Sequence, residues 1–469
     1  MTEPRPSDPA RRPLRSSPSA RSSPGHIVDE RSVHDRDLDA LIGQPLASFR
    51  RVVLAVSGGS DSMAMMVLAA RWVASGRVPA DMLIDVATVD HGLRAESARE
   101  ADWVAERARA LGFRHTTLAW SGEKPASGVQ EEARAARYAL LTAHAQAGPQ
   151  PAAIVTGHTA DDQAETLIMR LGRGSGLDGL AGMSPARPLM PDSSVVLVRP
   201  LLSLSKQALR GLLVRAGGTW LEDPSNDSLD FERVRLRAAD AHLEAIGLSN
   251  AKLALSAQRL SRARQALEAL TQERLSSLVD VHQGSYASLN RQAWVSEPAE
   301  LRVRLLARLL DTFGGLARPA QLSQIEALEE VLAAGRPIAQ TLGGCMVSQG
   351  WTTLRLYREP GRQALSDAVL EPGREILWDR RFRVAYRLPE EGEEGEAEAR
   401  PVSVRPLGLA AYATLREALG DADRPPARAA ATLPSVWSGD RLLAVAGLPG
   451  AAVTDGRFIF TFLGFDRAA

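Results

Sequence analysis

Cysteine is almost absent from this chain of 469 residues, which contains only Cys345. One cysteine excludes a disulfide within the chain, and it excludes zinc or iron–sulfur sites built from the chain's own cysteines. We therefore expect a reducing cytoplasm as the protein's location. Cys345 itself falls in a hairpin expected at 343–358, where it would serve as a small apolar residue.

Long hydrophobic runs are also absent. No apolar stretch reaches the roughly 18 to 20 residues that a helix needs to cross a bilayer, so we expect no membrane insertion. The first 25 residues are rich in Pro, Ser and Arg and lack the apolar region of a signal peptide. This composition is typical of a disordered leader, which we place at 1–45.

Lysine is scarce as well, because only three of the 56 basic residues are lysines and the others are arginines. The 56 acidic residues balance the basic ones, so net charge alone does not indicate a nucleic-acid partner. The planar guanidinium of arginine suits phosphates. A bias this uniform is nevertheless more typical of codon composition than of selection for binding.

The chain is too long for a single hydrophobic core, so about two or three domains are expected. Between 46 and 217, strand-like runs alternate with helical patterns, which predicts an α/β fold with a doubly wound parallel sheet. After a first strand, further strands are expected at 82–89, 115–120 and 152–156. Ligands of such sheets bind beyond the carboxyl ends of the strands. The turns after the first, second and fourth strands should therefore face one crevice.

The first turn follows the apolar run at 52–56 and reads Ser57-Gly58-Gly59-Ser60-Asp61-Ser62, with a helix expected from Met63. Glycines that expose amide groups, together with a helix N-terminus, suit a bound phosphate. A Walker A loop would carry a lysine after its glycines. Asp61 occupies the comparable place, and an acid beside a phosphate makes sense when Mg²⁺ lies between them. The alternative is an ordinary Ser or Asp cap on a buried helix.

A second group of acids lies in the segment 157–166, after the expected fourth strand. If a helix begins near Thr159, then Asp161, Asp162 and Glu165 fall in its first two turns, and the last two share a face. Such carboxylates can bind a metal or a cationic substrate such as an amine. Acids also favour helix N-termini on electrostatic grounds alone. The pairing with the first turn is what favours a binding site.

With the motifs around them, these turns resemble the tRNA(Ile)-lysidine synthetases, which are PP-loop ATP pyrophosphatases. The resemblance is dense over 52–237, and Val234 stands where the family's closing Arg-Asn-x-Ile/Leu-Arg motif has Asn. That substitution removes one local hydrogen-bonding side chain. The matching motifs are SGG-x-DS, Asp90-His91-Gly92-Leu93-Arg94, the segment 132–138, GH-x-x-DD-x-x-ET, and the segments 167–183, 199–202 and 222–226.

The resemblance implies ATP-dependent modification of the wobble cytidine of a tRNA(Ile) with a CAU anticodon. ATP adenylates the carbonyl oxygen at carbon 2, pyrophosphate leaves, and free L-lysine displaces AMP. In this scheme the SGGSDS turn holds the pyrophosphate, and Asp61 carries Mg²⁺ with Asp161 as a second metal ligand. Asp162 and Glu165 bind the ammonium of lysine and accept a proton from the attacking amine.

Two arginines on the helix expected at 130–147 complete the expected catalytic set. Arg134 or Arg137 would steady a phosphate or the lysine carboxylate through a bidentate contact. In the alternative interpretation both arginines pair with Glu131 and Glu132 on a helix surface.

Three further residues are expected beside the nucleotide, namely Asp90, His91 and His158 at the ends of strands. We interpret the histidines as structural or nucleotide-stacking groups, because no third metal ligand is evident near them.

Two rival functions follow from the same first turn. A tRNA thiolase would share the ATP chemistry, but sulfur transfer generally relies on paired cysteines or an iron–sulfur cluster. A non-catalytic adenine-nucleotide sensor would not need the second group of acids.

Beyond residue 232 the patterns change. Residues 233–359 read as a helical domain. Its segment 233–274 contains eight basic residues and only four acidic ones. This surplus of basic residues is compatible with contact to the tRNA backbone. For any single one of these basic residues, exposure on a solvated helix face is an equally good explanation. Residues 366–469 resemble the C-terminal tRNA-recognition domain of longer family members, with an acidic surface loop at 390–398. The sequence leaves the oligomeric state open, a homodimer included.

Overall fold

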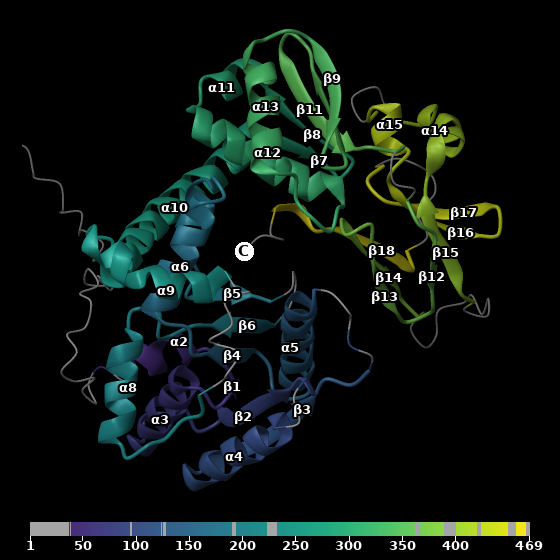
Figure 1. Cartoon of the computed structure of the whole chain (residues 1–469). Coiled ribbons are helices and arrows are strands. Elements are labelled where there is room, and N and C mark those ends of the chain that lie inside the picture. The colour runs from purple at the N-terminus through teal and green to yellow at the C-terminus, as the bar shows by residue number, and fades with distance from the viewer. Residues whose placement is uncertain are drawn as a thin grey trace, which may run out of the picture.

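The computed structural model describes residues 37, 39–93, 96–122, 124, 128–189, 194–222, 232–361, 365–388, 400–419, 424–448 and 456–465. Several predictions lie outside these residues: those for the leader up to 36, for Arg94, for 223–226 and for the acidic segment 390–398. No helix of the described part is long and apolar enough to cross a bilayer. The described chain forms three successive units (Figure 1).

The first unit contains a six-stranded sheet of order β3-β2-β1-β4-β6-β5. Its strands are parallel except for the edge strand β5, which runs antiparallel to β6. The four predicted strands are confirmed to within one residue at each end. The bounds are β1 Arg51–Ala55, β2 Leu83–Asp90, β3 Arg114–Ala119, β4 Ala152–Thr156, β5 Ala186–Pro188 and β6 Val195–Val198.

Helices cover both faces of this sheet, as the sequence predicts (Figure 1). Val52 and Leu54 of β1 belong to the core under α3, α4 and α8, whereas Val53 belongs to the core under α5. Successive side chains of a strand point to opposite faces, so burial on both faces explains the unbroken apolar run. The helix bounds are α3 Ser60–Ala74, α4 Ser97–Ala110, α5 Val129–Gln146 and α8 Lys206–Arg215.

The first core begins before residue 46, which corrects the expected end of the leader. The π-helical turn η1 (Asp39–Gly43) and α2 (Gln44–Leu46) contribute Ile42 and Leu46, each about 1% exposed, to the core that contains α3. Because these two apolar residues are four positions apart, they lie on one helical face, which packs against the first unit. The segment is too short for this helical spacing of apolar residues to be recognised in the sequence.

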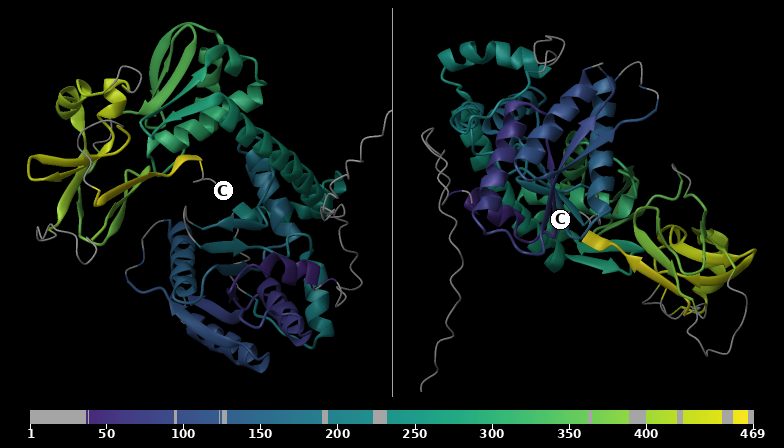
Figure 2. Two further views of the ribbon diagram at one scale, coloured as in Figure 1. Left: turned by 180° about the vertical axis from the view of Figure 1, so that it is seen from behind. Right: turned by 90° about the horizontal axis from the view of Figure 1, so that it is seen from below.

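The second unit departs from the first through helices. After α6 (Ala160–Leu171) and α7 (Leu177–Leu180), α9 (Glu232–Ala245) leads into the 29-residue helix α10 (Asn250–Leu278). In two views, α10 runs from the first unit to the second, and the third unit lies on the far side of the second (Figures 1 and 2). Arg304 of α12 (Ala299–Gly314) also forms an ion pair with Asp178 of α7 at 2.8 Å, which joins the first two units.

The second unit contains the expected helices and hairpin, but it also contains three strands that the expectation of a helical domain leaves out. A five-stranded antiparallel sheet of order β7-β8-β11-β10-β9 packs one face against helices, and the sequence predicts only its β10–β11 hairpin. The other strands are short and partly polar, so they show little period-two signal. The bounds are β7 Val279–His282, β8 Tyr286–Asn290, α11 Arg291–Val295, α12 Ala299–Gly314, α13 Leu322–Ala333, β9 Ile338–Leu342, β10 Cys345–Gln349 and β11 Thr353–Arg358.

The third unit is rich in strands, in agreement with the sequence. It contains a four-stranded sheet of order β12-β15-β16-β17 and a three-stranded sheet of order β13-β14-β18, which share one hydrophobic core. The bounds are β12 Ala368–Leu370, β13 Glu375–Trp378, β14 Phe382–Tyr386, β15 Val402–Pro406, α14 Gly408–Arg416, α15 Ala427–Ala430, β16 Pro434–Ser438, β17 Arg441–Val445 and β18 Phe458–Phe462.

A buried ionic joint connects the second and third units. Asp379 accepts from Arg358 Nε of β11 at 3.1 Å and from Arg381 Nε at 2.6 Å. Arg381, which is fully buried, also donates to the backbone oxygen of Thr432 at 2.6 Å. Beside this joint, the Phe462 ring packs between two other rings, Phe313 and Phe382. Buried charges that lose a partner are costly, so the joint favours a single arrangement of the two units.

Candidate active site

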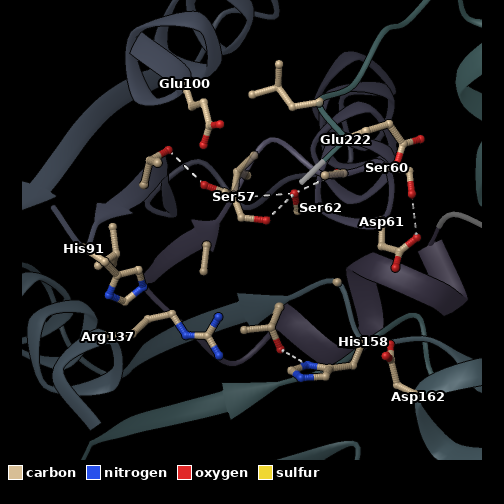
Figure 3. Close-up of a pocket in the computed structure, with 18 of the residues that line it drawn as sticks. Ser57, Ser60, Asp61, Ser62, His91, Glu100, Arg137, His158, Asp162 and Glu222 are labelled. Carbon is tan, nitrogen blue, oxygen red and sulfur yellow. Dashed lines mark hydrogen bonds between the residues drawn. The ribbon is translucent and has the colours of Figure 1, made fainter. Parts of the chain in front are cut away.

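The turn after β1 forms the floor of the site (Figure 3). The helix α3 begins at Ser60, three residues earlier than expected, so Ser60, Asp61 and Ser62 form its first turn. Gly58 has a φ of +92°, a conformation that favours glycine, and a Cβ there would meet Leu221 at 2.9 Å. The turn lines the crevice and leads directly into a helix N-terminus, which is a position suited to an anion.

The hydroxyl of Ser62 fixes this turn internally. Its Oγ accepts from the Ser57 amide at 3.2 Å and donates to the Gly59 carbonyl at 2.9 Å. The Ser57 and Ser62 hydroxyl oxygens lie 3.3 Å apart. A turn whose shape is fixed by its own side chain does not need to be ordered when an anion binds.

The turn after β4 packs directly against the first turn. A Cβ on Gly157 would lie 2.9 Å from the backbone carbonyl of Asp61, so only glycine fits between the two turns. The two signals found far apart in the sequence are therefore in contact. In Figure 3, Asp61, His158 and Asp162 lie at one end of the cavity, and His91 and Arg137 lie towards the other.

The helix α6 begins as the sequence predicts, with Thr159 as its N-cap. Thr159 and Asp162 form a capping box, in which Asp162 Oδ2 accepts from the Thr159 amide at 2.8 Å. Burial opposes ionisation of Asp162, but Lys206 and the Thr159 amide outweigh it and hold the pKa of the carboxyl below its ordinary value. The carboxylate is thus ionised, and its Oδ1 faces a cation.

Asp162 and Glu165 share one face of α6, as predicted, and this face meets two cations. Lys206 Nζ lies 3.4 Å from Asp162 Oδ1 and 3.8 Å from Glu165 Oε1. Arg237 Nε donates to Glu165 Oε1 at 2.7 Å. The Glu165 residue is only 5% exposed. The acid pair therefore accommodates a primary ammonium group, the one that Lys206 carries.

Lys206 and Arg237 are the two cationic partners of the α6 acids, and sequence reasoning does not assign them to the site. Lys206 begins α8 and Arg237 lies on α9, so neither is near α6 in the chain. Two signals point towards them: Lys206 is one of only three lysines, and Arg237 ends the motif that contains Val234. Neither signal indicates a partner, because the pairing depends on how α8 and α9 pack.

Asp61 is the acid with the least support from its surroundings. Burial raises its pKa, Lys206 lowers it, and the neighbouring Asp162 and Asp161 raise it further, so that the pKa lies above the ordinary value. Ser60 donates a hydrogen bond to it at 3.1 Å. Carboxylates that crowd together beside an anion-binding turn fit a divalent cation, which would relieve their repulsion.

Asp161 is more fully engaged than Asp61. Its Oδ2 accepts from the Lys206 amide at 2.7 Å, and its Oδ1 accepts from Asn250 Nδ2 at 3.3 Å. Each oxygen keeps a second lone pair, so Asp161 still fits as a metal ligand while it fixes the starts of α8 and α10. Among the described residues, no group of three or more His, Cys, Asp and Glu side chains is arranged to hold a metal ion.

The crevice is a cavity of about 1890 Å³ at the carboxyl ends of β1, β2 and β4, as predicted. That volume exceeds the roughly 300 to 1,000 Å³ of ordinary ligand pockets, so it has room for more than one substrate. The expected site residues that line it are Ser57, Gly59, Ser60, Asp61, Ser62, His91, Arg137, His158, Asp161 and Asp162.

Four expected residues are not part of the cavity lining: Gly58, Asp90, Arg134 and Glu165. Asp90 accepts from the Gly92 amide at 2.8 Å and from Ser97 Oγ at 2.6 Å, so it orders the turn after β2. Both Arg134 and Arg137 lie near the Tyr138 ring, at 5.2 and 5.4 Å. Only Arg137 reaches the cavity, which favours it over Arg134 as a ligand of a substrate.

The ring of His158 should be neutral at neutral pH. Burial lowers the pKa of His158 to about 4, with a smaller contribution from the charges of Arg199 and Arg137. Together they outweigh Asp162, which raises this pKa. Its Nδ1 lies 2.8 Å from Thr156 Oγ1. We expect the ring signal of His158 in NMR, assigned by its loss in His158→Gln, to titrate with a midpoint near 4.

The unfolded chain would take up this proton near the ordinary pKa of about 6.5, above the folded value. Since the unfolded state binds more protons between those two values, the contribution of His158 to stability falls as pH drops from about 6.5 to about 4. A midpoint near 6.5 in the folded protein would contradict the buried, neutral ring.

Comparison with known proteins agrees with this geometry. A family model described as a PP-loop domain matches residues 31–240. The tRNA(Ile)-lysidine synthase of Ruegeria pomeroyi is 39% identical over 401 residues, which cover 85% of this chain and 89% of that protein. That of a Bradyrhizobium species is 42% identical over 362 residues, covering 73% and 99%.

Among solved structures, the chain is similar to the U34-tRNA thiolase NcsA from Methanococcus maripaludis. The TM-score is 0.41 and the sequence identity is 16%, over 49% of this chain and 78% of that one.

Proposed function

Because this chain belongs to the tRNA(Ile)-lysidine synthase family, we propose that it joins free L-lysine to carbon 2 of the wobble cytidine of tRNA(Ile) with a CAU anticodon. The reaction consumes ATP and gives lysidine, AMP and pyrophosphate through an adenylated cytidine. The new bond joins carbon and nitrogen, so the enzyme is a ligase. The reaction belongs to the bacterial cytoplasm, where tRNA, ATP and free lysine meet.

One observation carries the proposal: the acid pair of α6 already accommodates a primary ammonium group. Lys206 Nζ lies within 3.8 Å of both Asp162 and Glu165. Lys206 and Asp162 line the same crevice as the anion-binding turn, whereas Glu165 is not part of its lining. Free lysine carries the same group, and a cavity of about 1890 Å³ has room for it beside a nucleotide.

In the first step, the amides at the start of α3 bind the phosphates that leave as pyrophosphate, and they stabilise the charge that develops there. Mg²⁺ held by Asp61 and Asp161 would neutralise part of that charge when it is bound. Arg137 reaches the cavity from α5 and offers a bidentate contact to a phosphate or a carboxylate. The adenylated oxygen then leaves far more readily than a carbonyl oxygen.

In the second step, Asp162 and Glu165 orient the lysine. Asp162 can accept the proton that the attacking nitrogen loses, because its carboxyl is ionised and its Oδ1 faces the ammonium site. Arg237 holds Glu165 in place through the 2.7 Å bond. The amine attacks carbon 2, and AMP leaves with the oxygen.

A thiolase with the same ATP chemistry is less well supported. Cys345 is fully buried in β10, and burial raises the pKa of its thiol to about 12. A thiol in that state is a poor nucleophile and sulfur carrier.

The assay that tests the proposal uses purified full-length protein, ATP, Mg²⁺, radiolabelled lysine and a tRNA(Ile) transcript with a CAU anticodon. We expect label in the tRNA and one pyrophosphate for each lysine incorporated. A transcript with a cytidine-to-uridine change at the wobble position is the matched control and should stay unlabelled. Labelling from sulfide in place of lysine would overturn the proposal.

A further inference from the structure

Lys206 lies between the two parts of the crevice that the proposed reaction uses. Its Nζ is 3.4 Å from Asp162 Oδ1 and 3.8 Å from Glu165 Oε1. Its charge also acts on Asp61 in the anion-binding turn, because burial raises the pKa of Asp61 and Lys206 is the strongest of the groups that lower it. Asp61 and Asp162 lie at the same end of the cavity (Figure 3). The ammonium group of Lys206 therefore contacts the acid pair and lies within electrostatic reach of the anion-binding turn.

The oxygens that Lys206 contacts are the ones that a substrate ammonium needs. Asp162 Oδ2 accepts from the amide and the hydroxyl of Thr159, at 2.8 and 2.9 Å, so Oδ1 is the oxygen that faces a cation. Glu165 is buried, and its Oε1 also accepts from Arg237. Two ammonium groups at this pair would occupy the same small volume and repel each other. Free lysine must therefore displace the Lys206 side chain.

The backbone of Lys206 is held independently of its side chain. Its amide donates to Asp161 Oδ2 at 2.7 Å, and it begins α8, for which Ser205 is the N-cap. The side chain is 27% exposed, and a lysine carries its compact charge on a flexible four-carbon stem. Rotations about the side-chain bonds can therefore move the ammonium group while α8 stays in place.

We propose that Lys206 keeps the lysine site closed until ATP binds, and that its ammonium group then moves from the acid pair to the phosphates at the anion-binding turn. A triphosphate brings several negative charges to that turn, whereas the acid pair keeps Arg237 and Thr159 as partners when Lys206 leaves. Because one group links the two sites, ATP and lysine should each raise the affinity for the other by the same factor. The proposal rests on the proposed function, which supplies lysine and ATP as substrates.

The test compares full-length wild type with Lys206→Met, which keeps the backbone contact to Asp161 and most of the side-chain length but removes the charge. Lysine binding is measured by calorimetry without tRNA, with and without Mg²⁺ and an ATP analogue that cannot be cleaved between its α and β phosphates. We expect wild type to bind lysine about tenfold more tightly with the analogue than without it. Without nucleotide, Lys206→Met should bind lysine about tenfold more tightly than wild type, and the analogue should change that affinity by less than about twofold.

Lys252→Met is the matched control. Lys252 Nζ donates to the Gly247 oxygen at 3.1 Å on the surface, and Lys252 lies outside the lining of the crevice. This variant should bind lysine as wild type does, with and without the analogue. Thermal unfolding would verify that both variants keep their fold.

Pyrophosphate release without lysine, at saturating ATP and tRNA, provides a second readout. We expect it to be about a hundredfold slower in Lys206→Met, because the variant lacks a positive charge that the leaving phosphates would otherwise attract. Tighter lysine binding together with a slower first step is a combination that a general structural defect does not produce.

Two results would overturn the inference. One is a Lys206→Met variant that, without nucleotide, binds lysine no more tightly than wild type does. The other is a variant in which the analogue still strengthens lysine binding as much as in wild type. A wild type that binds lysine but does not incorporate it into the tRNA would instead contradict the proposed function.

Discussion

Replacing Asp61 by Asn is expected to lower the rate of pyrophosphate release about a thousandfold, the size of effect seen when one charge-stabilising group is removed from an active site. Asn keeps the shape of the side chain and removes its charge. Asp61 lies in the first turn of α3 and lines the crevice, so in the proposed mechanism the charge that it loses is the one next to the leaving phosphates. Quench-flow measurement of pyrophosphate with saturating tRNA and ATP would report this step directly.

The same substitution should leave the folded state as stable as before or stabilise it. The pKa of Asp61 is raised in the folded protein by burial and by its acidic neighbours, so the ionised carboxylate is disfavoured there relative to the unfolded chain. For a carboxyl with a raised pKa, this cost to folding grows as pH rises from the unfolded pKa through the folded one. We therefore expect Asp61→Asn without ligands to unfold at the same or a higher temperature than wild type.

A matched control is Asp81→Asn, because Asp81 is an exposed acid of the same unit that lies 3.9 Å from Arg50. It should change neither the rate nor the unfolding temperature noticeably. Loss of activity in Asp61→Asn together with a large drop in unfolding temperature would show that Asp61 acts through the fold, and the assignment to the leaving group would then be wrong.

Replacing Glu165 by Gln is expected to raise the KM for lysine about a hundredfold while adenylation changes much less. Glu165 is buried and lies between Arg237 and Lys206, so its charge determines how strongly a cation is held on that face of α6. Removing one member of a buried, hydrogen-bonded charge pair typically costs a factor of this size in binding. Pyrophosphate release without lysine measures the first step, and lysine incorporation measures the second.

Glu232→Gln is the matched control for this change. Glu232 pairs with Arg173 on the surface, where ion pairs contribute little. If Glu165→Gln reduced both steps equally, the division of roles between Asp61 and the acid pair would be incorrect.

The sequence predicts the first unit well because its signals are local. The apolar run of β1, the glycines of the turn and the Thr159 cap each act within a few residues, and the rule for parallel sheets brings the two turns together. What the sequence does not predict depends on packing between distant segments. Lys206 and Arg237 reach the acids of α6 only because α8 and α9 fold back onto it.

The second unit is harder to predict for a different reason. Its strands β7 and β9 are short and carry polar residues on the face that lacks helices, so their pattern competes poorly with the long helix α10. The role of Asp90, in the turn after β2, is also difficult to predict. An acid at the end of a strand looks the same in the sequence whether it binds a nucleotide or accepts a hydrogen bond from the backbone, as Asp90 does from Gly92.

The joint around Asp379 has a mechanical consequence. Since the buried Arg358–Asp379 ion pair and the contact of Phe313 with Phe462 hold the outer two units together, we expect these units to move as one rigid body. The outer two units are connected to the first through α10, whose 29 residues span about 43 Å, and through the Arg304–Asp178 ion pair. The length of this one helix therefore sets how far the outer two units lie from the crevice (Figure 1).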